Sequence, residues 1–218
     1  SFLNVVIYRL PKMMDEAWAI EAEAYRQKDK PDWLPPAPQI SLSHPSSRCG
    51  HCGHAIRWYE NIPVFSWLFL RGKCAACKSG ISWRYPLIEL LTGMLFAYSA
   101  WRFGVSWAML AWCVFSALVV ALFWIDWDTT FLPDSLTQPL LWLGLMLAML
   151  SLNPLIERFS DAFWGVVIGY CLFIPLAWIV GKIKGQQAMG NGDYKLMAAL
   201  GAWLGWQALL PIVLMSSI

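Results

Sequence analysis

Apolar residues gather in five long stretches that follow a polar N-terminal third of the chain. The stretches run roughly over 86–101, 105–125, 138–152, 162–181 and 196–215. A membrane-spanning helix needs about 20 apolar residues, and each stretch comes near that length, although the first and third are short. The pattern predicts an all-α polytopic membrane protein, in which a bundle of transmembrane helices carries a small cytoplasmic module.

The N-terminal third divides into segments of different character. The run from Ser1 to Ile7 is apolar and meets Arg9 and Lys12 at once, which predicts the end of a first spanning helix whose start is missing. The apolar run that reaches Ile218 predicts a missing final stretch as well. We therefore expect three parts, namely residues 1–12 as the end of that first helix, a cytoplasmic domain over 13–84 and a transmembrane domain over 85–218.

Within the polar part, residues 15–30 contain strong helix formers and many charges, which predicts a solvated surface helix. Residues 31–47 contain five prolines and several serines, so they are expected to form a linker without regular structure. Residues 48–84 carry four cysteines and many turn residues, which predicts a small module held together by a metal.

Composition supports a membrane protein and excludes one class of partner. Hydrophobic residues make up 58% of the chain and charged residues 14%, whereas soluble domains have about 45–50% and about 25%. The 15 tryptophans suit membrane–water interfaces. A net charge of +2 without a basic stripe gives no indication of nucleic-acid binding.

The distribution of lysine and arginine predicts the orientation in the membrane. With the polar module on the cytoplasmic side and the stretches threaded alternately, 14 of the 16 basic residues face the cytoplasm, and only Arg102 and Arg158 lie outside. This is the excess that the positive-inside rule describes. It also brings segments 126–134 and 182–195 to the same, cytoplasmic side of the membrane.

Four cysteines form two CxxC pairs, Cys49–Cys52 and Cys74–Cys77, separated by 21 residues. Two such pairs can complete the tetrahedral shell of one Zn²⁺. Disulfides and a redox CxxC are the alternatives, but the cytoplasm is reducing and two copies flanked by turns fit zinc better. The sequence predicts a structural zinc with no open coordination position for catalysis.

Other cysteines and histidines are expected to have plainer roles. His51 and His54 beside the first pair are expected at the surface, with replacement of a cysteine ligand as the alternative. Cys113 and Cys171 lie inside apolar stretches, where a buried free thiol is expected.

Two aspartates lie next to predicted membrane-spanning stretches, where an ionisable side chain has a high free-energy cost and is often functional. Asp126 directly follows an apolar stretch, and Asp193 ends the sequence Gly190-Asn191-Gly192-Asp193. One ionised and one protonated carboxylate are the acid–base pair that hydrolyses a peptide without a metal. Gly190 and Gly192 would let the backbone approach an extended substrate or adopt a positive φ.

Simpler roles remain open for several of these aspartates. Asp193 precedes a helical run and could be an N-cap, and Asp134 after Pro133 is expected to be one. Asp128 could be solvated in a loop. On a helix, Asp126 and Asp128 point about 200° apart, so they cannot both face one partner.

The order of these motifs strongly resembles the bacterial type IV prepilin peptidases, also called leader peptidase/N-methyltransferases. Five elements carry the resemblance over nearly the whole chain: the opening Ser1–Pro11, the paired CxxC module, the segment Trp83–Gly93, the block ending in Leu132-Pro133-Asp134, and the GxGD block Gly190–Asp193.

The resemblance implies an aspartic protease of the inner membrane with Asp126 and Asp193 as the catalytic pair. The family is similar in its GxGD motif to presenilin-type proteases. Its members cut prepilins and pseudopilins after the Gly that ends a basic leader, and then methylate the new N-terminal residue, usually Phe, with S-adenosylmethionine. Whether the substrates here belong to a type IV pilus or to type II secretion is left open.

The methyl-donor site is not evident, because no Gly-rich nucleotide cradle is present. Glu89, within an apolar stretch, is one candidate for substrate or methyl-donor binding, and pairing with a nearby Arg or Lys is its alternative. Gly190, Gly192 and Lys195 are further candidates. Two other functions remain as alternatives: a transporter with Asp126 and Asp193 as an ion relay, and a secretion scaffold in which they are structural caps.

Overall fold

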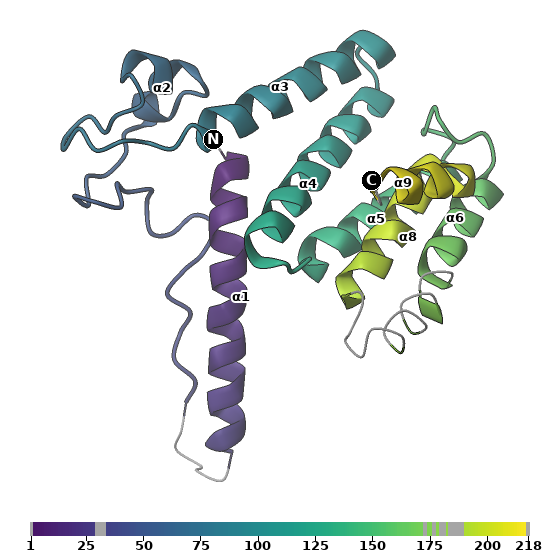
Figure 1. The fold of residues 1–218 in the computed structure, drawn as a ribbon, viewed down its shortest axis with the longest axis horizontal. Coiled ribbons are helices and arrows are strands. Elements are labelled where there is room, and N and C mark those ends of the chain that lie inside the picture. Colours follow the sequence, from purple (N-terminus) through teal and green to yellow (C-terminus); the bar gives the residue numbers. More distant parts are fainter. Residues whose placement is uncertain are drawn as a thin grey trace. The chain divides into compact units, whose positions relative to one another are not determined.

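The computed structural model describes residues 2–28, 34–171, 174, 175, 178, 182 and 190–216. Within these residues the chain is helical and has no β-strand, only two isolated bridges, between Arg48 and Ala55 and between Lys73 and Gly80. The chain divides into two compact units, Ser1–Met94 and Leu95–Ile218 (Figure 1). The predicted helical class is therefore confirmed for the part of the chain that the structure describes.

The first unit contains α1 (Phe2–Arg26), the 3₁₀ helix η1 (Trp58–Asn61), α2 (Phe65–Phe69) and the start of α3 (Arg84–Phe103). The apolar opening of the chain and the polar surface helix were predicted as separate elements, but they form one continuous helix that contains Pro11 (Figure 1). The strong helix formers that follow Pro11 favour continuation of the helix.

The linker has no regular structure over residues 34–47, as predicted, but it is fixed along α1. The Glu16 carboxylate accepts hydrogen bonds from the backbone N–H groups of Gln39 at 2.7 Å and Ile40 at 3.2 Å. The Arg9 guanidinium donates to the carbonyls of Ser41 at 2.9 Å and Pro45 at 2.6 Å. Side chains of α1 thus satisfy backbone groups that the linker could not pair within itself.

The second unit contains α4 (Trp107–Thr129), α5 (Asp134–Met149), α6 (Phe159–Cys171), α8 (Asn191–Leu204), the 3₁₀ helix η2 (Trp206–Ala208) and α9 (Leu209–Ser216). Its core is centred on the fully buried Trp203, whose indole N–H donates to the Leu140 carbonyl at 2.7 Å. The ring of Phe115 on α4 lies 4.8 Å from that of Trp203. One aromatic side chain of α8 therefore connects α4, α5 and α8.

Glycines let α6 and α8 touch along their backbones. A Cβ atom on Gly165 would collide with the backbone of Gly201, and one on Gly169 would lie 2.7 Å from the Met197 carbonyl oxygen. Helices in membranes commonly approach each other through such small residues, because van der Waals packing replaces the hydrophobic driving force there. The position of α8 is therefore fixed closely by α6.

One predicted stretch is divided in the structure. The stretch 196–215 was expected to be continuous, but α8 ends at Leu204 and α9 begins at Leu209. Gly205 has φ +79°, a conformation that interrupts a helix and that glycine adopts without strain. The stretches 86–101, 105–125 and 138–152 correspond to α3, α4 and α5, and most of 172–181 lies outside the described residues.

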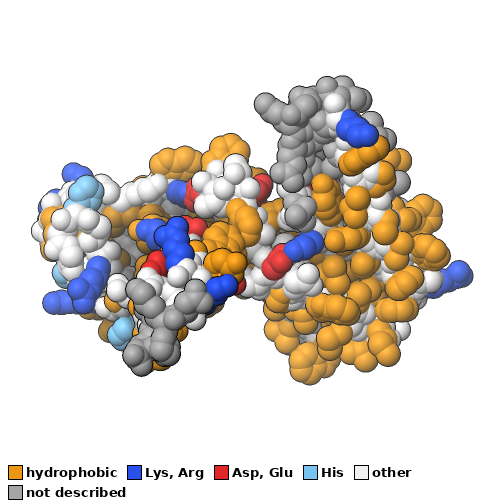
Figure 2. Space-filling view, turned by 90° about the horizontal axis from the view of Figure 1, so that it is seen from below, with side chains coloured by type: hydrophobic (Ala, Val, Ile, Leu, Met, Phe, Trp, Pro, Cys, Tyr) orange, Lys and Arg blue, Asp and Glu red, His pale blue; other side chains and the backbone are white. Residues whose placement is uncertain are grey.

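By length and composition, one helix among the described residues is long and apolar enough to cross a membrane, namely α4, with mean hydropathy 2.4. Figure 2 shows hydrophobic side chains over much of the visible face of the second unit. The large hydrophobic side chains that are exposed in the second unit include Trp107, Phe123, Trp142, Phe163 and Trp164. A surface of this kind indicates contact with lipid or with another protein.

Candidate functional site

Asp126 lies in the last turn of α4, where a long apolar helix ends. The helix is closed by Thr130, which has φ 52° and donates its backbone N–H to the Asp126 carbonyl at 2.7 Å. The Asp126 side chain is exposed, although Ile125 beside it is completely buried. The end of the helix thus presents a carboxylate directly beyond its apolar part.

Asp193 lies in the first turn of α8. Its carboxylate turns back and accepts a hydrogen bond from the Gly190 N–H at 2.9 Å. Asp193, the third residue of the helix, thus pairs with the backbone N–H of the N-cap residue. The N-cap is Gly190, with φ −74°, so the N-cap role that the sequence left open for Asp193 is not the one observed, and Gly190 does not adopt a positive φ. The other carboxylate oxygen has no hydrogen bond among those found for the described residues.

The two sequence blocks meet in space. A Cβ atom on Gly192 would lie 2.7 Å from Leu132 Cβ, so this glycine permits a close approach of α8 to the loop before α5. The Lys195 ammonium is 2.7 Å and 2.6 Å from the two carboxylate oxygens of Asp134. Gly192 therefore makes its close approach to Leu132, and the approach to an extended substrate stays a prediction.

Asp134 was expected to cap the next helix, and this expectation is wrong. Pro133 is the N-cap of α5, no side chain forms a capping hydrogen bond there, and Asp134 is the first helical residue. Its carboxylate instead binds Lys195, which the sequence had suggested for substrate or methyl-donor binding. Asp128, which lies in the last turn of α4, is exposed.

The four predicted cysteine ligands converge in the first unit. The Sγ atoms of Cys49, Cys52, Cys74 and Cys77 all lie within 4.8 Å of one another, and those of Cys49 and Cys77 are 3.8 Å apart. Zn–S bonds of about 2.3 Å in a tetrahedron place two sulfurs about 3.8 Å apart. The cluster therefore has the size and the donor set of a structural metal site.

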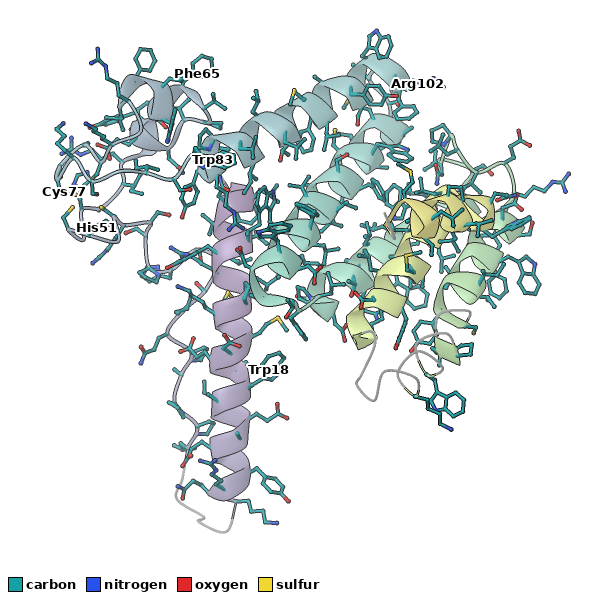
Figure 3. The ribbon with its side chains drawn as sticks, in the orientation of Figure 1. Trp18, His51, Phe65, Cys77, Trp83 and Arg102 are labelled. Carbon is teal, nitrogen blue, oxygen red and sulfur yellow. The ribbon has the colours of Figure 1, made fainter. Side chains whose placement is uncertain are left out.

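The two knuckles around this cluster repeat each other with an offset of 25 residues. In the first, the Cys49 N–H donates to the His54 carbonyl at 2.8 Å, and in the second the Cys74 N–H donates to that of Ser79 at 2.8 Å. Gly53 and Lys78 occupy equivalent positions with φ 70° and φ 59°. Figure 3 labels His51 and Cys77, one from each knuckle.

The environment favours the thiolate form at Cys49 and Cys77, whereas the His54 backbone is outweighed at Cys52, where burial and the neighbouring sulfurs raise the pKa to about 11. Backbone N–H groups of Cys52 and His51 and the Ser79 hydroxyl lower the pKa of Cys49 to about 5. The Ser79 hydroxyl and backbone also lower the pKa of Cys77. Because metals bind the thiolate form, these donors prepare the cluster for a cation.

The remaining cysteines and histidines stay outside the cluster. His54 Nε2 lies 3.2 Å from a Glu60 carboxylate oxygen, and His51 is exposed, so the cluster found contains cysteines only. Cys113 and Cys171 are free, as expected, but Cys113 is half-buried and Cys171 is exposed within the chain.

Glu89 has backbone and amide partners. One carboxylate oxygen accepts from the Asn4 amide at 3.3 Å, and the other accepts from the Val64 N–H at 2.8 Å. Asn4 is 7% exposed and also donates to the Tyr85 carbonyl at 3.2 Å. Sequence reasoning missed Asn4, although a polar residue inside the apolar opening was the signal that could have identified it.

Comparison with known proteins also divides the chain into an N-terminal and a C-terminal part, with a boundary about ten residues further along than that of the compact units. Residues 1–103 match the bacterial peptidase A24 N-terminal domain, and residues 113–218 match the type IV leader peptidase family. No solved structure matches the chain with significant similarity.

Curated relatives match over the whole chain. A prepilin leader peptidase/N-methyltransferase of Stutzerimonas stutzeri is 48% identical, covering 100% of this chain and 73% of the relative. Proteins of that name from Neisseria gonorrhoeae and Aeromonas hydrophila are each 45% identical, again over 100% of this chain and over 74% and 73% of the relatives. With both domain matches in order and this identity throughout, the chain belongs to the type IV leader peptidase family.

Proposed function

We propose that this protein is a membrane aspartic endopeptidase and N-methyltransferase in which Asp126 and Asp193 form the peptidase site. It removes the basic leader of type IV prepilins or type II secretion pseudopilins after a Gly, and methylates the new N-terminal residue, usually Phe. The observation that carries the proposal is the contact between the two sequence blocks that contain these carboxylates, made by Gly192 against Leu132 and by Lys195 with Asp134.

The two carboxylates divide the work of hydrolysis. One is ionised and takes a proton from the attacking water, while the other is protonated and donates to the carbonyl oxygen and then to the leaving amine. Two close carboxylates cannot both ionise easily, so the pair shares one proton. The Gly190 N–H holds one oxygen of Asp193, which leaves the second oxygen for the water or the substrate.

The membrane setting follows from the charges and the exposed apolar surface. The helices of the second unit form a transmembrane bundle in the inner membrane. Of the 16 basic residues of the whole chain, 14 then lie on the cytoplasmic side. The peptidase site and the four-cysteine module then face the cytoplasm, where the basic leader of a prepilin is expected. Leader and Gly can reach the site while the apolar pilin helix stays in the bilayer.

Cys49, Cys52, Cys74 and Cys77 would hold one Zn²⁺. Four thiolates close the coordination shell, so the metal would stabilise the module and supply no open position for a substrate. Peptide hydrolysis then depends on the aspartates alone.

The reaction is tested with the protein in membranes and a purified prepilin as substrate. We expect the wild type to remove the leader and to leave an N-methylated first residue, both measured by mass spectrometry. Asp193→Asn keeps the shape of the side chain and should leave the leader in place, with a rate at least about a thousandfold lower. A wild type that leaves the prepilin intact, or an Asp193→Asn variant that cuts at the normal rate, would contradict the proposal.

The ion pair between Lys195 and Asp134 is expected to position the peptidase site. Lys195→Met should lower kcat for leader cleavage about tenfold and leave KM unchanged, because α8 loses one contact that holds Asp193 near Asp126. Its effect on the free energy of unfolding should be below about 1 kcal/mol, because the pair is partly exposed. Exchanging the two charges, with Asp134→Lys and Lys195→Asp together, should restore part of the rate.

Lys182→Met provides the matched control for this test. Lys182 stacks on Trp178 instead, with its ammonium 3.9 Å from the ring centroid. A Lys182→Met variant as slow as Lys195→Met would show that loss of charge, and not loss of the ion pair, lowers the rate.

A further inference from the structure

Asn153 is a buried polar residue in the loop between α5 and α6. It is 4% exposed, and its side-chain amide donates to the backbone carbonyl of Trp203, fifty residues later, at 2.9 Å. Its side-chain oxygen accepts the Leu155 N–H at 3.1 Å, which is a bond within the loop itself. One side chain thus stabilises its own loop and also binds the end of α8.

The carbonyl that Asn153 binds belongs to the last turn of α8, because Trp203 directly precedes the final residue Leu204. The last four carbonyls of a helix have no partner inside the helix, and they point along its axis beyond the C-terminal end. A donor bound to such a carbonyl opposes a displacement of the helix along its own axis, since that displacement changes the length of the hydrogen bond directly. The Trp203 indole, which donates to the Leu140 carbonyl of α5, adds a second buried hydrogen bond at the same residue.

Two other contacts of α8 depend less on its position along the axis. Gly165 and Gly201 touch by van der Waals contact between backbones, which has no donor and acceptor to align. The ion pair between Lys195 and Asp134 at the start of α8 is partly exposed, and exposed ion pairs are weak. The buried hydrogen bonds at Trp203 are therefore better suited to fix the axial position of the helix.

We propose that Asn153 is a positioning residue of the peptidase reaction. By fixing α8 at Trp203, it sets the axial position of Asp193, which lies near the other end of the same helix. The two residues of α8 are ten positions apart, or about 15 Å along a stiff helix, so a displacement of one end is transmitted to the other. The inference rests on the proposed function, because Asn153 acts on hydrolysis only through Asp193.

A small displacement of Asp193 is enough to slow the reaction. A catalytic acid or base must lie within hydrogen-bond reach of the proton that it transfers, and a misplacement of about 1 Å can cost on the order of a hundredfold in rate. An interaction that matters mainly in the transition state affects kcat and leaves KM unchanged. Loss of the Asn153 bond to α8 is therefore expected to lower kcat.

Two substitutions separate the bond to α8 from the bond within the loop. Asn153→Ser keeps an oxygen that can accept the Leu155 N–H, but its side chain is one atom too short to reach the Trp203 carbonyl. Asn153→Leu has nearly the same size as the wild-type residue and loses both bonds. With the whole protein in membranes and a purified prepilin, we expect both variants to lower kcat about tenfold and to keep KM within about twofold of the wild type.

A pair of cysteines measures the position of α8 without a substrate. A Cβ atom on Gly192 would lie 2.7 Å from that of Leu132, so cysteines at both positions can form a disulfide after a shift of about 1 Å. The variant with Leu132→Cys and Gly192→Cys is treated with a mild oxidant, and the rate of formation of this disulfide is measured by mass spectrometry. We expect the rate to fall about fivefold when Asn153→Ser is added, because disulfide geometry is specific.

Ser116→Ala is the matched control for both measurements. Ser116 is 8% exposed, and its hydroxyl donates to the Trp112 carbonyl at 2.8 Å within α4. Its substitution removes a buried hydrogen bond that does not involve α8, so we expect wild-type values of kcat and of the disulfide rate.

The outcomes separate the two proposals. A wild-type kcat or a wild-type disulfide rate in Asn153→Ser would overturn the positioning role of Asn153. A loss of kcat confined to Asn153→Leu would also overturn it, because the bond within the loop would then be the one that matters. A wild type that cuts no prepilin would overturn the proposed function, whereas the disulfide rates would still show whether Asn153 fixes α8.

Discussion

Replacing Asp126 with Asn is expected to abolish leader cleavage, with a rate at least about a thousandfold below that of the wild type. An amide cannot take a proton from water, and it cannot share a proton with Asp193 as a carboxylate does. Loss of one member of a catalytic unit commonly costs as much as loss of the whole unit. The rate of leader removal from a purified prepilin, followed by mass spectrometry, measures the effect.

Asp128→Asn is the matched control for this variant. Asp128 lies two residues further along α4, at an angle of about 200° from Asp126, so it points to another side of the helix. We expect its cleavage rate to stay within about threefold of the wild type, since Asp128 is exposed and points away from the side of the helix that carries Asp126. Equal losses in the two variants would mean that the charge of the helix end, and not one carboxylate, supports the reaction.

Replacing Cys74 with Ser is expected to remove the metal and unfold the module over residues 48–82. Cys74 is 6% exposed, and its sulfur belongs to the cluster of four. The module has no strand among its described residues and only short helices, so little other than the metal can stabilise it. Binding of a structural zinc contributes about 10–16 kcal/mol in small domains, and losing one thiolate removes much of this.

Metal analysis and limited proteolysis measure this second effect. The wild type should contain one zinc per chain and resist cleavage within the module, whereas Cys74→Ser should contain none and be cut there. Cys113→Ser, at a half-buried cysteine of α4, should keep the metal. If Cys74→Ser kept both its zinc and its resistance to protease, the four-cysteine assignment would be wrong.

The sequence was sufficient to predict the elements that depend on local pattern. Apolar stretches of the right length predicted helices where α3, α4 and α5 lie, and cysteine spacing predicted the cluster around Cys49 and Cys74. Both signals depend on properties of nearby residues, namely hydrophobicity over a window and a fixed three-residue spacing, so no knowledge of distant contacts was needed.

Predictions failed where a distant contact or a single backbone angle decides the structure. Asp134 follows a proline and looks like an N-cap, but Lys195, sixty-one residues away, takes its carboxylate. The sequence offered a positive φ as one of two roles for Gly190 and Gly192, whereas Gly205 has one and divides the last apolar stretch. Hydrophobicity reports burial but not chain direction, so neither outcome could be obtained from the pattern alone.

The backbone contact between Gly165 and Gly201 has a consequence for the chemistry. Gly201 lies eight residues after Asp193 on α8, which is about 12 Å along a helix axis. A helix is stiff over that length, so a methyl group added at Gly201 would tilt α8 and displace the carboxylate at its other end. Sequence changes at this glycine pair, about 12 Å from Asp193 along the helix, should therefore alter turnover without altering the peptide that is chosen.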